Sequence, residues 1–183
     1  MKREDLHIVN VRKEVVATSQ LLSKKALMAG SWGNVSARID KDSYAITPSG
    51  HSYETLTPDD IIIVNREGVK MTGNSYPSTE TKLHVAIYKK FPEAGAVIHT
   101  HSIFACTMAV LRHDLPPIIE DTAQVVGGSV DCAAYAMPGT EELAQNVLLA
   151  LGKKRAAFMA NHGVVCWGCD MKEAYMTAEL VEK

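Results

Sequence analysis

Three histidines stand at positions that suit a catalytic metal site. His99 and His101 are separated by one residue directly after the small, apolar run 94–98, which predicts a short buried strand. Because side chains at i and i+2 of a strand point to the same face, both imidazoles can reach one metal ion. His162 follows a second apolar run, 156–160. Three neutral imidazoles leave a fourth position open on zinc, which is typical of a catalytic rather than a structural zinc site.

Each histidine also has a structural interpretation that involves no metal. His-x-His pairs occur without a metal, so a hydrogen-bonded structural role is the alternative for His99, His101 and His162. His84 lies one helical turn after Glu80 among apolar neighbours, which indicates helix packing. His7, His51 and His113 have polar or turn-like surroundings and are predicted to face solvent.

Three loops of small residues accompany the histidines: 33–36 (Gly-Asn-Val-Ser), 47–50 (Thr-Pro-Ser-Gly) and 77–80 (Pro-Ser-Thr-Glu). Such loops let backbone N–H groups and hydroxyls converge on an oxyanion, and a helix N-terminus adds a favourable dipole. Each alone is an ordinary turn or helix cap. Together they indicate a phosphate pocket. Glu80 either caps the helix that starts there or, if its loop faces the metal, serves as a ligand or base.

Composition narrows the class of protein. The 183 residues are 46% hydrophobic and 22% charged, which predicts one globular domain over 1–183. A net charge of −2 without a Lys/Arg run argues against nucleic acid as a partner. No apolar stretch reaches the roughly 20 residues of a membrane span, and the N-terminus lacks a signal-peptide core, so we expect a cytoplasmic protein. Cys166 and Cys169 have the spacing of a redox or zinc pair, but without a second pair we expect buried free thiols.

Hydrophobic periodicity and turn residues predict an irregular alternation of helices and strands. Helices are expected over 1–29, 79–90, 103–111, 140–154 and from Asp170 to the end; strands are expected over 34–39, 43–47, 61–65, 97–100, 117–119, 125–133 and 157–167. The absence of a regular βα period favours a single-domain, three-layer α/β/α fold with a central, mainly antiparallel or mixed sheet.

The order of these motifs resembles the class II aldolase/adducin family. The resemblance runs from about Gly30 to the C-terminus and rests on six motifs in register: the three small-residue loops, His99-Thr100-His101, Gly127-Gly128 and Asn161-His162-Gly163. It implies the α/β/α fold of that family. It also implies a homotetramer with active sites at subunit interfaces.

The resemblance assigns a role to each motif. His99, His101 and His162 match ligands of one zinc ion per subunit, and Glu80 matches the acid that ligates the resting metal and then acts as base. The matching phosphate pocket comprises Gly33, Asn34, Ser49, Gly50, Ser78 and Thr79. The implied reaction is retro-aldol cleavage of a phosphorylated sugar, a ketose 1-phosphate of the L-fuculose 1-phosphate type. It yields dihydroxyacetone phosphate and an aldehyde through a zinc-stabilised enediolate.

Two departures from the family keep other readings open. Asp121 stands where a tyrosine proton donor is expected, and it is either an acid or base, as in the related dehydratases, or a loop residue. The chain ends soon after Leu180, short of the family pattern, so we expect weaker closure over the site or altered specificity. The alternatives are a pentulose-5-phosphate 4-epimerase, a methylthioribulose-1-phosphate dehydratase and a catalytically silent adducin-like assembly module. Retention of all three histidines favours an enzyme.

Overall fold

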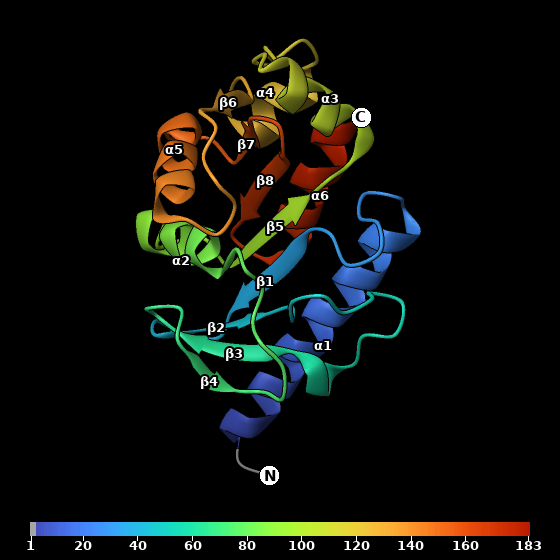
Figure 1. The fold of residues 1–183 in the computed structure, drawn as a ribbon, viewed down its shortest axis with the longest axis vertical. Coiled ribbons are helices and arrows are strands. Elements are labelled where there is room, and N and C mark those ends of the chain that lie inside the picture. Colours follow the sequence, from blue (N-terminus) through green and yellow to red (C-terminus); the bar gives the residue numbers. More distant parts are fainter. Residues whose placement is uncertain (1–2) are drawn as a thin grey trace.

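The computed structural model describes residues 3–183 and contains one mixed sheet of eight strands (Figure 1). The strand order is β4-β3-β2-β1-β5-β8-β7-β6, and every neighbouring pair is antiparallel except β6–β7. The strands are β1 (Asn34–Arg38), β2 (Ser43–Ile46), β3 (Ile62–Asn65), β4 (Lys70–Thr72), β5 (Ala96–Thr100), β6 (Asp131–Ala133), β7 (Ala156–Met159) and β8 (Gly163–Gly168).

Helices cover both faces of this sheet. They are α1 (Arg3–Lys24), the 3-10 helix η1 (Pro58–Asp60), α2 (Thr81–Lys90), α3 (Ile103–Leu111), α4 (Glu120–Val126), α5 (Glu141–Leu151) and α6 (Met171–Glu182). Figure 1 shows α2 and α5 together on one side of the sheet and α1 and α6 on the other. The expected three-layer α/β/α architecture is confirmed. None of the described helices is both long enough and apolar enough to span a membrane.

Alternating side chains of the central strands divide the core into two clusters. Val97 and Val165 pack with the α2–α5 layer, whereas Ile98 and Val164 pack with α1, α3 and α6. His99 has the same parity as Val97 along β5, so its side chain points towards the α2 side of the sheet. The alternation of side chains along β5 therefore determines that His99 faces the helix layer that contains α2.

Two helices begin at the caps that the sequence indicates. The Thr140 hydroxyl accepts a hydrogen bond from the Leu143 N–H at the start of α5. The Asp170 carboxylate accepts one from the Glu173 N–H at the start of α6. Each contact satisfies a backbone donor that has no partner inside the helix.

Several predicted elements are wrong in their extent or type. The first helix ends at Lys24 rather than near Gly30, because Ala26 has a left-handed φ of 58°. Residues 1–2 of that predicted helix lie outside the described part of the chain. No strand forms over 117–119, and 125–133 divides into the end of α4, a glycine turn with φ 89° at Gly127, and β6. The predicted strand 157–167 is a hairpin, β7–β8, and the short β4 was not predicted.

The exposure of the cysteines, and of the three histidines predicted to face solvent, agrees with prediction in most cases. All four cysteines are free; Cys166 is buried as expected, but Cys169 is exposed. His7 and His113 are exposed, whereas His51 is half-buried. The Cys-x-x-Cys segment forms neither a disulfide nor a histidine-assisted metal cluster among the described residues.

Candidate active site

His99 lies in the middle of the sheet, where its ring is completely buried. Its backbone pairs with Asn34 of β1 on one side and Val165 of β8 on the other. The ring Nδ1–H donates to the Val164 carbonyl at 2.9 Å. This hydrogen bond fixes the ring orientation and leaves Nε2 as the nitrogen that faces the other histidines.

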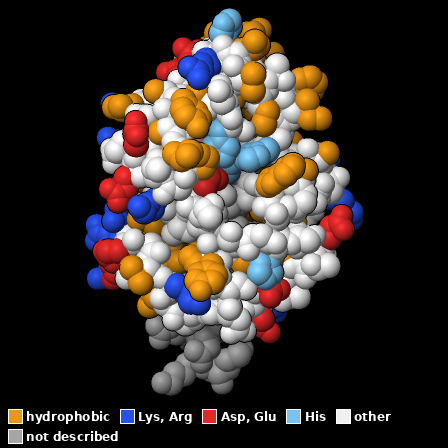
Figure 2. Space-filling model, in the orientation of Figure 1, with side chains coloured by type: hydrophobic (Ala, Val, Ile, Leu, Met, Phe, Trp, Pro, Cys, Tyr) orange, Lys and Arg blue, Asp and Glu red, His pale blue; other side chains and the backbone are white. Residues whose placement is uncertain are grey.

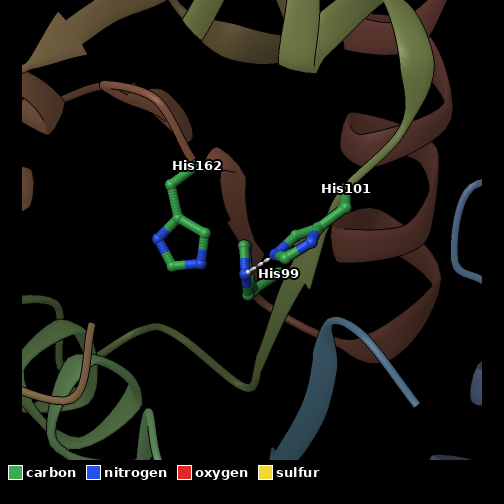
Figure 3. A group of neighbouring side chains, drawn as sticks. All are labelled: His99, His101 and His162. Carbon is green, nitrogen blue, oxygen red and sulfur yellow. Dashed lines mark hydrogen bonds between the residues drawn. The ribbon is translucent and has the colours of Figure 1, made fainter. Parts of the chain in front are cut away.

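The three predicted histidines converge. His101 Nε2 lies 2.9 Å from His99 Nε2, and the His162 ring centroid lies 4.8 Å and 5.0 Å from those of His99 and His101. One ligand nitrogen from each residue lies within 4.8 Å of the others. Figure 3 shows the three rings turned towards one another, although His162 comes from the β7–β8 turn rather than from β5. In Figure 2, histidine side chains reach the surface near the centre of one face, with hydrophobic side chains around them.

Two glycines and one left-handed residue make this approach possible. A Cβ on Gly163 would lie 2.4 Å from the Thr100 carbonyl oxygen and within about 3 Å of two histidine rings. A Cβ on Gly33, which has a φ of 91°, would lie 2.6 Å from the His99 carbonyl oxygen. Asn161 adopts a φ of 58° at the hairpin turn and so places His162 over the site. Only glycine, which has no Cβ, allows the close contacts at positions 33 and 163.

Glu80 completes the cluster from the start of α2. Its side chain is almost fully buried, with Oε2 3.0 Å from His99 Nε2 and Oε1 3.5 Å from His162 Nε2. Asn34 Nδ2 donates to the same Oε2 at 3.0 Å. The loop before α2 therefore faces the histidines, which is the arrangement in which Glu80 was expected to be a ligand or base rather than only a helix cap.

The cluster shares one negative charge among several imidazoles. Burial acts to raise the pKa of Glu80, but the charge and hydrogen bond of His99, with His162 and Asn34, outweigh it and hold this pKa well below its ordinary value. Burial and neighbouring histidine charges lower the pKa of His101 and of His162 to about 4. Burial opposes ionisation of His99 too, but Glu80 raises its pKa. Neutral His101 and His162 are ready to act as ligands.

The residues present fit a zinc ion. Glu80 Oε1 is buried and has no hydrogen-bond partner, and neither has His162 Nδ1. A buried carboxylate oxygen without a partner is costly, and a cation held by the three histidines and Glu80 would satisfy it. Three imidazoles and one carboxylate are a donor set that zinc accepts.

The three small-residue loops lie against one another beside this cluster. Thr47 N–H donates to the Val35 carbonyl at 3.0 Å, and Ser78 N–H donates to the Thr47 carbonyl at 3.1 Å. Ser49 and Gly50 are exposed, as is Thr79, whereas Ser78 is buried and accepts a hydrogen bond from the Glu80 N–H. The structure thus brings together the loops that were predicted to form a phosphate pocket. The Asn34 amide, however, is already engaged with Glu80 and His84.

Comparison with known proteins places this site in a family. Residues 13–183 match the family described as Class II Aldolase and Adducin N-terminal domain. L-fuculose phosphate aldolase of Escherichia coli strain K12 is 34% identical over 170 residues, which are 93% of this chain and 78% of that protein. The chain belongs to the class II aldolase and adducin family.

Further relatives agree with this assignment. A 5-deoxy-D-ribulose 1-phosphate aldolase of Bacillus thuringiensis serovar kurstaki is 34% identical over 172 residues, covering 93% of this chain and 80% of that protein. A solved structure of L-fuculose 1-phosphate aldolase has a TM-score of 0.90 and 33% identity, with 94% of this chain and 82% of that chain covered. The fold and the enzyme class, a class II aldolase, are those that the sequence motifs predict.

One predicted residue of this class II aldolase lies apart from the cluster. Asp121 is exposed in the first turn of α4, and no hydrogen bond or ion pair joins it to Glu80 or to a histidine of the cluster. Within one chain, therefore, it does not take part in the candidate active site. Its proposed role depends on a neighbouring subunit.

The sequence predicts helix packing for His84, and the structure adds polar contacts to it. His84 is buried, as packing would require, but both ring nitrogens are hydrogen-bonded, to Ser36 Oγ and to Asn34 Oδ1. Burial lowers its pKa to about 3, so it is neutral. The signal that could have revealed it is the polar spacing Glu80, His84 and Tyr88 along one helix face.

Proposed function

We propose that this class II aldolase cleaves a ketose 1-phosphate, of the L-fuculose 1-phosphate type, to dihydroxyacetone phosphate and an aldehyde. The observation that carries the proposal is the convergence of His99, His101 and His162 with an unpaired oxygen of Glu80. The loops around Thr47 and Ser78, which hydrogen-bond to one another next to Glu80, supply the place for a phosphate.

In the proposed reaction, different residues bind the metal, transfer the proton and bind the phosphate. His99, His101 and His162 would hold one zinc ion per subunit, and that ion supplies Lewis-acid polarisation of the substrate carbonyl when bound. Glu80 moves the proton at the carbon next to this carbonyl, because its Oε1 has no other partner. The Ser49, Gly50, Ser78 and Thr79 turns bind the phosphate and fix the position of the reacting carbon.

Two named activities among the relatives support the substrate class rather than one substrate. L-fuculose phosphate and 5-deoxy-D-ribulose 1-phosphate are both named as substrates of relatives that are 34% identical to this chain. Both are ketose phosphates that differ in the part released as aldehyde. The phosphate-bearing end is therefore the part of the substrate that we assign to the three loops.

We also propose a homotetramer with sites completed at subunit interfaces. Several large apolar side chains of α3 and the segment before α4 are exposed, and apolar surface of this kind is typical of an association face. They are Ile103, Phe104, Val110, Leu111, Ile118 and Ile119. Asp121 follows this surface directly and would act as acid or base in a neighbouring site.

The direct test combines metal analysis with an assay of dihydroxyacetone phosphate release from ketose 1-phosphates. We expect about one zinc per chain and cleavage that stops on chelation and returns on adding zinc. Bound zinc without cleavage would favour the epimerase or dehydratase alternatives. Failure to bind zinc at all would leave the silent assembly module.

A further inference from the structure

A buried line of hydrogen bonds leads away from Glu80 between β1 and α2. Glu80, His84 and Tyr88 follow one another at four-residue spacing from the start of α2, and Asn34 and Ser36 share one face of β1. The contacts alternate between strand and helix: Asn34 with Glu80, His84 with Asn34, Ser36 with His84 at 2.6 Å, and Tyr88 with Ser36 at 2.8 Å. We call these five residues the polar ladder.

The charge of Glu80 determines the direction of every hydrogen bond in the polar ladder. A carboxylate only accepts, so Asn34 must present its Nδ2 to Glu80 and its Oδ1 to His84. His84 Nε2 must then carry the proton, which leaves Nδ1 as an acceptor for the Ser36 hydroxyl. Since the single Ser36 proton is used there, the Tyr88 hydroxyl donates to Ser36. All four groups thus donate towards Glu80, an arrangement in which each bond strengthens the next.

The polar ladder is expensive to bury and has no evident structural need. All five residues are almost fully buried, and apolar side chains of similar shape would fill this space without desolvating polar groups. Every donor of the ladder has an acceptor. Among its atoms, only Glu80 Oε1 is buried without a hydrogen-bond partner, and it lies 3.5 Å from His162 Nε2. The ladder therefore ends at the candidate active site, where Asn34 and His99 Nε2 both contact Oε2 of Glu80 and Oε1 has no hydrogen-bond partner.

We propose that His84 is a positioning residue that, through Asn34, holds Glu80 Oε2 and so selects Oε1 as the oxygen that exchanges the substrate proton. In the condensation direction a C–H bond of dihydroxyacetone phosphate breaks, its electron pair stays on the carbon as the enediolate, and the proton goes to Oε1; in cleavage the same proton returns from Oε1 to that carbon. The inference rests on the proposed aldolase function. Without the His84 donor, the Asn34 amide can turn over, and the carboxylate loses its fixed orientation.

The test compares two substitutions of His84 with one remote control. His84→Leu removes the donor to Asn34 at similar volume, and His84→Gln keeps an N–H that can reach Asn34 Oδ1. The matched control is Thr177→Val, because the Thr177 hydroxyl is also buried and hydrogen-bonded, to the Glu173 carbonyl of α6. For each zinc-loaded variant one measures zinc content, melting temperature, kcat and KM, and the exchange of the hydroxymethyl protons of dihydroxyacetone phosphate in D2O.

His84→Leu is expected to keep its zinc and its KM, while kcat and proton exchange both fall about 10- to 100-fold, as when a residue behind a ligand is lost. His84→Gln should recover most of this loss. Thr177→Val should leave both rates at the wild-type level even where its melting temperature falls. The proposal is overturned if His84→Leu exchanges protons at the wild-type rate, or if His84→Gln is no better than His84→Leu while both retain zinc.

A second measurement stays decisive if His84→Leu does not fold or if the wild-type protein is not an aldolase. In nitrogen-15 spectra of histidine-labelled wild-type protein, His84, assigned by its absence from His84→Gln, should be neutral with its proton on Nε2. A proton on Nδ1 would overturn the ladder. An inactive wild type with the Nε2–H form would reject the reaction and keep the orientation, whereas an active wild type with the Nδ1–H form would reject the inference alone.

Discussion

At the scale of single residues, Glu80 is the group on which the proposed chemistry depends. It accepts one hydrogen bond from Asn34, lies between two imidazoles, and keeps one oxygen free. Its pKa is held well below the ordinary value by His99, His162 and Asn34 against the effect of burial, so it is a carboxylate at neutral pH. A carboxylate in this position can act as a base that takes a proton from the substrate.

Replacing Glu80 by glutamine should therefore remove proton exchange while leaving the phosphate loops in place. We expect Glu80→Gln to lower kcat by about 10²- to 10⁴-fold, the range typical of a lost general base, with little change in KM. The assay is release of dihydroxyacetone phosphate by protein of measured zinc content. Glu142→Gln, an exposed acid in the first turn of α5, serves as control. A Glu80→Gln rate within a few-fold of wild type would contradict the assignment.

Gly33 offers a test of how closely the backbone must approach the histidine strand. Gly33 and Gly127 have nearly equal φ values, 91° and 89°, but only at Gly33 would a Cβ meet another atom, the His99 carbonyl oxygen at 2.6 Å. Both alanine variants carry similar backbone strain of roughly 1–2 kcal/mol. Gly33→Ala should in addition weaken zinc binding by displacing β5, as measured by competition with a chromogenic chelator. Equal zinc affinity of the two variants would show that the contact is unimportant.

Residue types at fixed spacing were the most predictable part of the site. His99, His101 and His162 could be proposed from sequence because a strand pattern or an apolar run preceded each one. His84 could not be distinguished from a packing residue, because its hydrogen-bond partners, Asn34 and Ser36, lie some fifty positions earlier. The order of the motifs gave Asp121 a position in the sequence pattern, but it did not predict where Asp121 lies relative to the histidines.

At the scale of elements, α2 and β1 are joined by polar contacts where a helix and a sheet usually meet through apolar ones. Burial lowers the pKa of His84 from 6.5 to about 3. The unfolded chain therefore binds a proton below about pH 6.5 that the folded chain does not. By linkage, the free energy of unfolding falls as the pH decreases through this window, by up to about 1.4 kcal/mol for each pH unit from this residue.

The corresponding prediction concerns the acid stability of chelator-treated protein. In urea unfolding at about pH 7, 6 and 5, His84→Gln should lose stability less steeply than wild type, because glutamine does not titrate. The two curves of unfolding free energy should therefore converge as the pH falls. Parallel curves over this range would mean that His84 titrates normally in the folded protein.

Elements were predictable where one hydrophobic pattern ran without interruption. Helix α3 occupies the predicted residues 103–111, and β1, β2 and β5 differ from prediction by one residue at an end. The hairpin β7–β8 was predicted as one strand, since both strands are fully buried and the turn at Asn161 interrupts no alternation. The strand predicted over 117–119 was wrong because its apolar residues are exposed beside α4.

At the scale of the whole molecule, the position of Asp121 makes a prediction about assembly. If Asp121 serves a neighbouring site, Asp121→Asn and Glu80→Gln tetramers should each be nearly inactive, yet mixed tetramers should contain some sites with both native carboxylates. Activity should reappear after unfolding and refolding the two variants together. Sedimentation should give a mass near four chains of 19.9 kDa. No recovery in mixed tetramers would remove Asp121 from the reaction.

The candidate histidine ligands lie in β5, directly after it and in the β7–β8 turn, and β5 is hydrogen-bonded on both sides to strands distant in sequence. In a chain whose sheet is still unassembled, a zinc ion thus finds only the local pair His99 and His101 without His162, so the complete site requires the folded sheet. Zinc can therefore stabilise the protein only after strands distant in sequence have paired, which is the slow step of folding. Zinc should consequently leave the refolding rate unchanged and lower the unfolding rate. The supply of zinc would then determine the lifetime of the folded protein rather than the rate at which it folds.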